Sequence, residues 1–324
     1  MNNRMKKFFR MIFLVSLPLF LFLPFIATAQ ETAQDYIKQG YVHMEKGQHD
    51  QAITSANEAI KQDPKSAKAW YLKGKAFFEK DQYDQAIADF TKAVEIDPKW
   101  AAAYAMRGQS YAGKGQHDQA IADYTRSIEL EPKLAAANHF LRGKAWLDKY
   151  RYDQAIADLT KAIELEPKLA VVYGLRGEAY YRKNKLDQAL ADLNKAIETN
   201  TQNVSAYRYR AEVYLRNGQA DQCIADLNKA IEMSPKMAVL YYIRAYAYGI
   251  KGQYEKALSD DDRAIELNPK YADAYLHKAL IYEEMKKNQE AAEAYKVFIK
   301  YVSPRDTAKI EAAKKKIGEL EKQK

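Results

Sequence analysis

Residues 81–98 read DQYDQAIADFTKAVEIDP, and the phrase returns with small changes as GQHDQAIADYTRSIELEP at 115–132 and YRYDQAIADLTKAIELEP at 150–167. The proline that closes it recurs at steps of 34 or 35 residues, with one double step of 68 that passes Thr201. A fixed period in this range is typical of stacked copies of one small unit. Because such a unit buries its apolar face only against its neighbours, the copies form one elongated surface. The period therefore favours a binding scaffold over a single catalytic pocket.

Each copy contains two runs of apolar and small residues at helical spacing, separated by a short turn. In residues 67–100 the two runs and the closing proline are Trp70, Gly74, Phe77, Ala86, Phe90, Ala93 and Pro98, and in residues 101–134 they are Tyr104, Gly108, Tyr111, Ala120, Tyr124, Ser127 and Pro132. Spacings of three and four place each run on one face of a helix. Each copy is therefore predicted to be a helix, a turn, a second helix and a second turn.

This order of aromatic, small and proline residues resembles the tetratricopeptide repeat, over about residues 33–305. The resemblance implies an all-α fold, in which tandem antiparallel helix pairs stack into a right-handed α-solenoid superhelix. It also implies that the first helix of each pair lines the concave face. Copies one to eight are expected at 33–66, 67–100, 101–134, 135–169, 170–203, 204–237, 238–271 and 272–305. Copy four has one extra residue, which we place in its leading turn. Departures from the pattern are Thr201 for proline, His43 for an aromatic residue, and Lys286 and Phe298 in copy eight.

A last helix is expected at residues 306–324, because Ile310, Ala313, Ile317 and Leu320 form one apolar stripe there. Ser303 is expected to cap this helix, with Pro304 in its first turn. A terminal copy has no neighbour against its apolar face, so a helix with a polar outer face is needed to cover it. The sequence therefore predicts a C-terminal capping helix.

The N-terminal segment has the pattern of a secretory signal peptide over residues 1–29. Four basic residues precede an uncharged apolar run from Met11 to Ile26, and Ala27-Thr28-Ala29 matches the small-x-small cleavage pattern. We expect cleavage after Ala29 and export, with a short basic segment and a single cysteine (Cys223) favouring a bacterial periplasm. The alternative is an uncleaved anchor in the inner membrane, since residues 11–29 are just long enough to cross a bilayer. Membrane contact is expected only in that case.

Charge and motif content argue against several functions. The formal net charge of the chain is +8. Residues 1–30 contain four basic residues and no acid, and the last 22 residues contain seven basic residues and four acids. The copies are thus nearly neutral and lack the basic stripe that nucleic-acid binding requires. The sequence contains no nucleophile elbow, phosphate-binding glycine loop or H-E-x-x-H motif. The five histidines lack paired metal-ligand spacing, so no catalytic residue, metal or cofactor is predicted.

A basic residue precedes the small residue of most first helices, and an acid recurs on the second helices. The residues are Arg107, Arg142, Arg176, Arg210 and Arg244, with Lys73 and Lys278 in equivalent places, and Asp89, Asp123, Asp158, Asp192, Asp226 and Asp260. We predict a structural ladder of Arg–Asp pairs, bidentate where geometry permits. Each acid is able to pair within its copy or with the next one. The ladder stops at both ends, where Ser55 and Ala294 replace the acid.

The positions that the resemblance assigns to the concave face vary from copy to copy, as a ligand-reading surface requires. The candidate binding residues are Tyr71, Lys75, Phe78, Phe140, Lys144, Glu178, Tyr181, Arg182, Arg208, Glu212, Arg216, Tyr242 and Tyr246. Tyr and Arg are enriched at binding hot spots. Copy three has small residues there, including Ala112 and Gly113, so the backbone of a partner is expected to approach closely.

These residues predict a non-enzymatic scaffold that binds an extended or helical peptide along copies two to seven, with other proteins or peptides as partners. Acidic groups of the peptide are expected near Arg182, Arg208 and Arg216. Two alternatives stay open. One is a membrane-tethered assembly factor, and the other is a glycan- or polymer-binding subunit of an enzyme complex, with tyrosines stacked on sugar rings.

Overall fold

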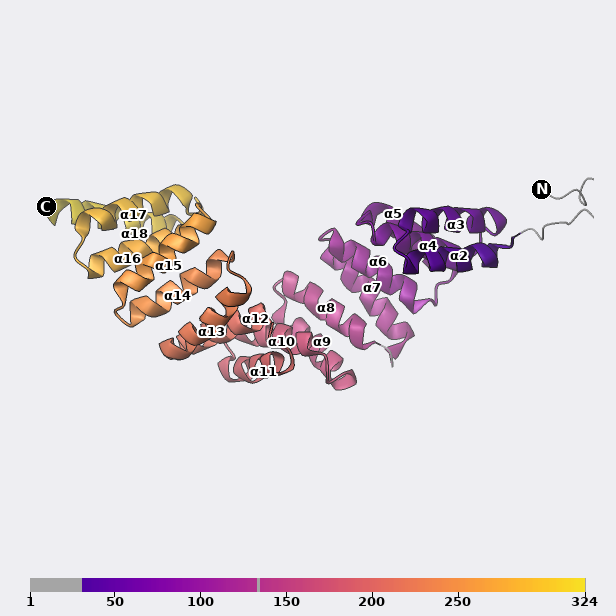
Figure 1. The fold of residues 1–324 in the computed structure, drawn as a ribbon, viewed down its shortest axis with the longest axis horizontal. Helices are drawn as coiled ribbons and strands as arrows, with labels where there is room; N and C mark the ends of the chain where they lie inside the picture. Colours follow the sequence, from indigo (N-terminus) through magenta and orange to yellow (C-terminus); the bar gives the residue numbers. More distant parts are fainter. Residues whose placement is uncertain (1–30, 133–134, 324) are drawn as a thin grey trace, which may run out of the picture.

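A computed structural model of the protein describes residues 31–132 and 135–323, and over these residues the chain is an all-α solenoid (Figure 1). Sixteen of the helices in this part form eight consecutive packed pairs, and the copies follow one another from the indigo end to the yellow end. The predicted fold class is therefore confirmed. The expected signal peptide at residues 1–29 lies outside the described residues.

The first helices of the pairs are α2 (Ala33–Glu45), α4 (Ala67–Phe78), α6 (Ala101–Gly113), α8 (Ala136–Asp148), α10 (Ala170–Arg182), α12 (Val204–Arg216), α14 (Ala238–Ile250) and α16 (Ala272–Glu284). The second helices are α3 (His49–Gln62), α5 (Tyr83–Ile96), α7 (His117–Leu130), α9 (Tyr152–Leu165), α11 (Leu186–Thr199), α13 (Ala220–Met233), α15 (Tyr254–Leu267) and α17 (Asn288–Tyr301). No helix in the described part of the chain combines the length and the apolar character that crossing a membrane requires.

The turn inside each pair depends on one residue with a left-handed backbone. Glycine takes this conformation in four turns, with φ of +68° to +72°, at Gly47, Gly115, Gly218 and Gly252. The other four turns use Asp81, Tyr150, Asn184 and Lys286, with φ of +56° to +58°. A left-handed residue ends the first helix and reverses the chain, so that the second helix returns along the first.

The turns between pairs contain the recurring prolines and are four residues long, except between α7 and α8. That connection is residues 131–135, of which 133 and 134 are not described, so the extra residue of copy four falls in this turn. A proline in these turns prevents the second helix from continuing into the next pair, and the turn between α11 and α12 has Thr201 in its place.

The core is a row of layers along the solenoid. The side chain that each second helix inserts against its own first helix is fully or almost fully buried, as in Phe90, Tyr124, Leu159, Leu193 and Leu227. Small alanines surround these side chains and let neighbouring helices approach closely. Cys223 is completely buried among them, and burial raises the pKa of its thiol to about 12. This cysteine therefore packs as a small apolar residue.

The C-terminal helix differs in one respect from the sequence prediction. Helix α18 (Thr307–Leu320) begins after a turn in which the backbone N–H of Asp306 donates to the carbonyl oxygen of Ser303, and a short 3₁₀ turn (Glu321–Gln323) follows it. The expectation that Ser303 caps the helix is therefore wrong, because Pro304 lies in the turn and not in the helix. Ala313 and Leu320 are buried against α17, with Ile310 and Ile317 beside them.

The turn at Tyr150 provides a test of the left-handed constraint. Tyr150 has φ of +58° and a side chain that is 77% exposed, so its ring makes little packing contribution. We expect Tyr150→Gly to raise the free energy of unfolding by about 0.5–1 kcal/mol, because removal of Cβ relieves the left-handed strain. The reverse change at the equivalent turn, Gly115→Ala, should lower it by a similar amount. Urea denaturation followed by circular dichroism measures both, and a destabilised Tyr150→Gly protein would contradict the argument.

Candidate functional site

The structure places the five arginines of the predicted ladder against aspartates of their own copies. In each pair Nε and Nη2 of the arginine donate to the two carboxylate oxygens over 2.7–2.9 Å, as in Arg176 with Asp192. The aspartates are 5–7% exposed. The hydrogen bonds that Arg176 donates to Asp192 raise the pKa of its guanidinium. Such a bidentate pair holds both side chains in one orientation.

Each ladder arginine also contacts the preceding copy, which the sequence analysis did not predict. The remaining Nη1 donates over 2.6–3.2 Å to a polar side chain of the previous second helix: Thr91, Thr125, Thr160, Asn194 or Asn228. The signal was present in the sequence, because Thr or Asn recurs two residues after every ladder aspartate except Asp260, which is followed there by Asp262. One guanidinium thus joins three helices, and the ladder fixes the stacking of one copy on the next.

A second set of ion pairs joins the copies at their outer ends. The lysine that follows a first helix pairs with the aspartate at the start of the previous second helix, in Lys80–Asp50, Lys114–Asp84, Lys149–Asp118, Lys183–Asp153 and Lys251–Asp221. In copy six Asn217 replaces the lysine. These aspartates are largely exposed, so each pair adds little stability.

Seven of the predicted binding residues line one pocket of about 320 Å³ on the first helices α10, α12 and α14. They are Tyr181, Arg182, Arg208, Glu212, Arg216, Tyr242 and Tyr246, and we call this site the arginine pocket. Leu215, Val239 and Ile243 complete its lining. Three successive copies therefore build the site, and no single copy contains it.

Two of the three arginines in this pocket already have carboxylate partners. Arg208 lies 3.3 Å from Glu212 and stacks 3.9 Å from the centre of the Tyr209 ring. Arg182 lies 3.8 Å from Glu178, which also accepts a hydrogen bond from the Tyr209 hydroxyl. These carboxylates neutralise both guanidinium groups and hold them in place.

Arg216 is different, because no carboxylate of the described chain lies within ion-pair distance of it. Its guanidinium stacks 4.3 Å from the centre of the Tyr181 ring, and Nη1 donates to Asn184 over 3.0 Å. The Tyr181 ring is 7% exposed, and burial together with Glu212 raises the pKa of its hydroxyl to about 12. Tyr181 thus acts as a buried support, and Arg216 presents an uncompensated positive charge to the pocket.

The opposite wall is aromatic and rests on an unusual buried pair. Tyr246 is 43% exposed, and its ring lies 5.2 Å from the imidazole of His277. His277 Nδ1 lies 2.7 Å from Oδ2 of Asp261, which is fully buried where the other copies carry Ala, Phe, Tyr or Leu. Burial raises the pKa of Asp261 to about 6. Sequence reasoning missed this pair, although an acid at a core position of the repeat was the available signal.

The other predicted groove residues do not join the arginine pocket. Phe78 and Lys144 line a separate pocket of about 250 Å³ beside copy three. Glu178 lies behind the arginines, and Lys75 lies in neither pocket. Tyr71 packs against Phe90 and Trp100, and Phe140 packs against the core of copy four. These two rings are therefore half-buried packing residues.

Copy three has small groove residues, as the sequence shows, and the structure places an aromatic ring beside one of them, Gly113. A Cβ atom added there would come within 2.8–3.0 Å of the Tyr83 ring. The Tyr83 ring of the preceding copy therefore covers the Cβ side of this glycine, while Ala112 and Gly113 also line the pocket of about 250 Å³. The ring also packs against Phe78 at 5.7 Å.

Comparison with known families and structures agrees with the helix pairs and their spacing. Profiles described as tetratricopeptide repeat match residues 37–99, 101–134, 136–169, 210–237, 238–271 and 262–293, and one described as TPR repeat matches 177–218. The chain belongs to the tetratricopeptide repeat family. Proteins of this family typically bind other proteins or peptides and are generally non-enzymatic. The comparison with curated proteins found no match.

Solved structures show the same fold at low identity. A chain of the Cut9–Hcn1 hetero-tetramer of APC/C superposes with a TM-score of 0.61 and 14% identity, covering 89% of this chain and 57% of that one. A tetratricopeptide repeat protein of Parabacteroides merdae gives 0.57 and 19%, covering 77% and 98%. The C-terminal part of a repeat protein of Cytophaga hutchinsonii gives 0.55 and 19%, covering 73% and 98%. At these identities the likeness concerns the fold alone.

The first rung of the ladder gives a pH-dependent prediction. Here Lys73 replaces arginine and lies 3.6 Å from Asp89, whose Oδ2 is buried without a hydrogen-bond partner. Burial raises the pKa of Asp89 to about 6, and Lys73 offsets this only in part. Between pH 3.8 and about 6 the folded protein holds a proton that the unfolded chain has lost, so this group lowers stability as the pH rises through that window.

We expect Lys73→Arg to remove this loss of stability with rising pH, because the guanidinium of an arginine reaches both carboxylate oxygens of Asp89. The variant should be more stable than the parent by about 1–2 kcal/mol above pH 6 and should gain little near pH 4. Urea denaturation of both proteins across this range measures the difference, in which contributions from other titrating groups cancel. An equal gain at both ends of the range would mean that Asp89 ionisation is not the cause.

Proposed function

We propose that this protein is a scaffold that mediates protein–protein contact by binding a peptide or helix along its concave groove, in the bacterial cell envelope. The observation that carries the proposal is the arginine pocket, in which groove residues of three successive copies converge. Its lining supplies one uncompensated cation, Arg216, opposite an apolar wall that includes Tyr242 and Tyr246. A peptide that carries a carboxylate close to an apolar side chain complements this arrangement.

The geometry favours a peptide over a glycan as the ligand. Stacking on a sugar requires an open aromatic face, but Arg216 covers Tyr181 and Trp100 packs against Tyr71 at 4.5 Å. Tyr242 packs against Tyr271 at 5.1 Å. The tyrosines that were candidates for sugar stacking are therefore already in contact with neighbouring side chains.

The groove proposal is tested by selecting binders from a phage-displayed library of random peptides. We expect the selected peptides to contain an acidic group, and Arg216→Gln to weaken them at least about tenfold, because a hydrogen bond to a charged partner is worth roughly 1.5–3 kcal/mol. Tyr246→Ala should weaken the same peptides through loss of apolar contact. Isothermal titration calorimetry measures both effects.

Lys229→Gln is the matched control, because Lys229 is an exposed cation on the second helix α13 and pairs with Glu232. It should leave the affinity unchanged. If Arg216→Gln and Tyr246→Ala bound the selected peptides as tightly as the parent, the pocket would not be the binding site. The same variants on a glycan array distinguish the two ligand classes, since glycan binding without peptide binding would overturn the proposal.

The envelope location is supported by the basic, apolar and small-residue segments of residues 1–29. We expect the protein secreted by a bacterial host to begin at Gln30, because cleavage follows Ala29. Mass spectrometry of the N-terminal peptide of the exported protein gives its first residue, and Ala29→Pro should block processing. Full-length protein retained in the membrane fraction would instead favour the tethered assembly factor.

A further inference from the structure

The ladder side of the solenoid contains a second site, at the copy where the ladder ends. In copies five, six and seven the ladder guanidinium lies between two tyrosines of its own first helix. The distances from Arg176 Cζ to the ring centres of Tyr173 and Tyr180 are both 5.8 Å. Arg210 and Arg244 repeat the arrangement at 5.6–5.9 Å. Two tyrosines and a guanidinium therefore form a recurring unit of this protein.

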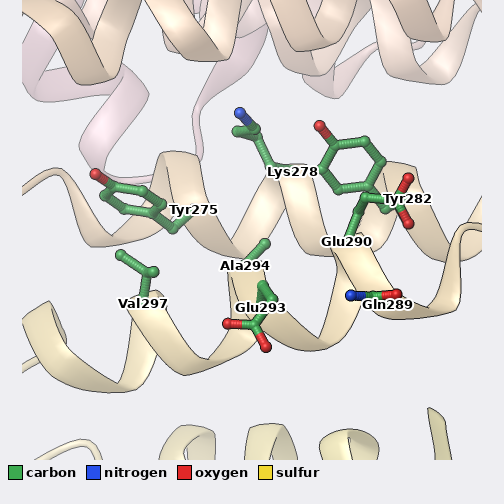
Figure 2. A pocket seen from close by; sticks show the side chains of 8 residues that line it. All are labelled: Tyr275, Lys278, Tyr282, Gln289, Glu290, Glu293, Ala294 and Val297. Atoms are coloured by element: carbon green, nitrogen blue, oxygen red, sulfur yellow. The ribbon is translucent and has the colours of Figure 1, made fainter. Parts of the chain in front are cut away.

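Copy eight keeps the two tyrosines but changes the ion pair. Tyr275 and Tyr282 occupy the places of the two rings, Lys278 stands where the arginine would be, and Ala294 replaces the aspartate. Lys278 pairs with Asp262 of the preceding copy instead of reaching α17. Figure 2 shows Lys278 between the two rings, with its amine turned away from the helix that carries Glu293 and Ala294.

An open pocket of about 580 Å³ lies between the two rings and α17. We call it the tyrosine slot; Tyr275, Lys278, Tyr282, Gln289, Glu290, Glu293, Ala294 and Val297 line it. Its volume falls in the range of roughly 300–1,000 Å³ that ligand sites have. Copy seven also has an open pocket at the equivalent place, of about 680 Å³, but there Asp260 of the ladder pair and the cation Arg263 line it.

The charges on the wall of the slot also differ from those of the other copies. In copy five the wall positions on the second helix are Asp187, Gln188, Ala191, Asp192 and Lys195, and in copy eight they are Gln289, Glu290, Glu293, Ala294 and Val297. Both walls carry two acids, at different positions, but the basic residue of copy five is replaced by Val297 in copy eight. Within the described chain no cation pairs with Glu290, and Glu293 pairs only with the exposed Lys296. With Lys278 neutralised by Asp262, the slot has an excess of negative charge.

We propose that the tyrosine slot binds an arginine side chain of a partner protein. The guanidinium lies between Tyr275 and Tyr282, as the protein's own arginines do in copies five to seven, and donates to Glu290 and Glu293. A lysine is a poorer ligand, because its compact ammonium neither stacks between rings nor makes a planar fork. The slot lies on the ladder face of α16, away from the concave groove, so it does not depend on the function proposed for the arginine pocket.

The probe for this site is N-acetyl-arginine N-methylamide, titrated into the mature protein with labelled tyrosine rings and followed by NMR. N-acetyl-lysine N-methylamide is the matched comparison. We expect the arginine probe to shift the Tyr275 and Tyr282 resonances at millimolar concentrations and to bind several-fold more tightly than the lysine probe. Equal affinity for both probes, or shifts confined to other tyrosines, would overturn the proposal.

Two variants locate the binding. Lys278→Arg with Ala294→Asp restores the Arg–Asp pair of the other copies, so it should fill the slot and abolish binding of the arginine probe. Glu290→Gln with Glu293→Gln changes only exposed side chains and should weaken the probe about tenfold, as expected for loss of charged hydrogen-bond acceptors. The second variant decides the question if the first does not fold, and unchanged affinity in it would refute the assignment.

Discussion

Every helix pair in this protein has an apolar face that it cannot bury alone, and the rest of the structure follows from this constraint. The side chains at the centre of each copy, such as Phe90 and Tyr124, are fully or almost fully buried between helices of about fourteen residues, which would be marginal in isolation. Stacking buries these apolar faces at the seven junctions between copies, and α18 covers the last one at the C-terminal end. Stability is therefore a sum over neighbouring copies and not a property of one central core.

The buried Arg–Asp ladder adds direction to this stacking. Apolar contacts tolerate small rotations between helices. An arginine that forms a bidentate pair with its own copy and also donates to the previous copy can make all of these hydrogen bonds only over a narrow range of helix positions. The net stability of such buried pairs is modest, because desolvation opposes the attraction. Their consequence is geometric. They keep the first helices in register, and residues of α10, α12 and α14 meet in the arginine pocket as a result.

Both candidate binding sites arise where the repeat is broken. In the arginine pocket, copies five to seven replace groove residues by Arg, Glu and Tyr, and Arg216 alone is left without an acid. In the tyrosine slot, copy eight loses Asp and Arg from the ladder but keeps the two rings that surround the guanidinium elsewhere. A scaffold of identical copies would offer many equal and weak sites, so departures at particular positions are what make one site different from the others.

The sequence by itself determined the helix pairs, their number and the identity of the ladder residues, because turn chemistry and helical periodicity are local and recur with each copy. It also indicated Tyr181, Arg182, Arg208, Glu212, Arg216, Tyr242 and Tyr246 as groove residues. Only the tertiary structure decided that these seven converge, that Tyr71 and Phe140 pack against the core, and that Tyr83 covers Gly113. It alone showed that Arg216 is uncompensated and that Lys278 turns to Asp262. These facts depend on distances between copies, which are set by helix packing and not by spacing along the chain.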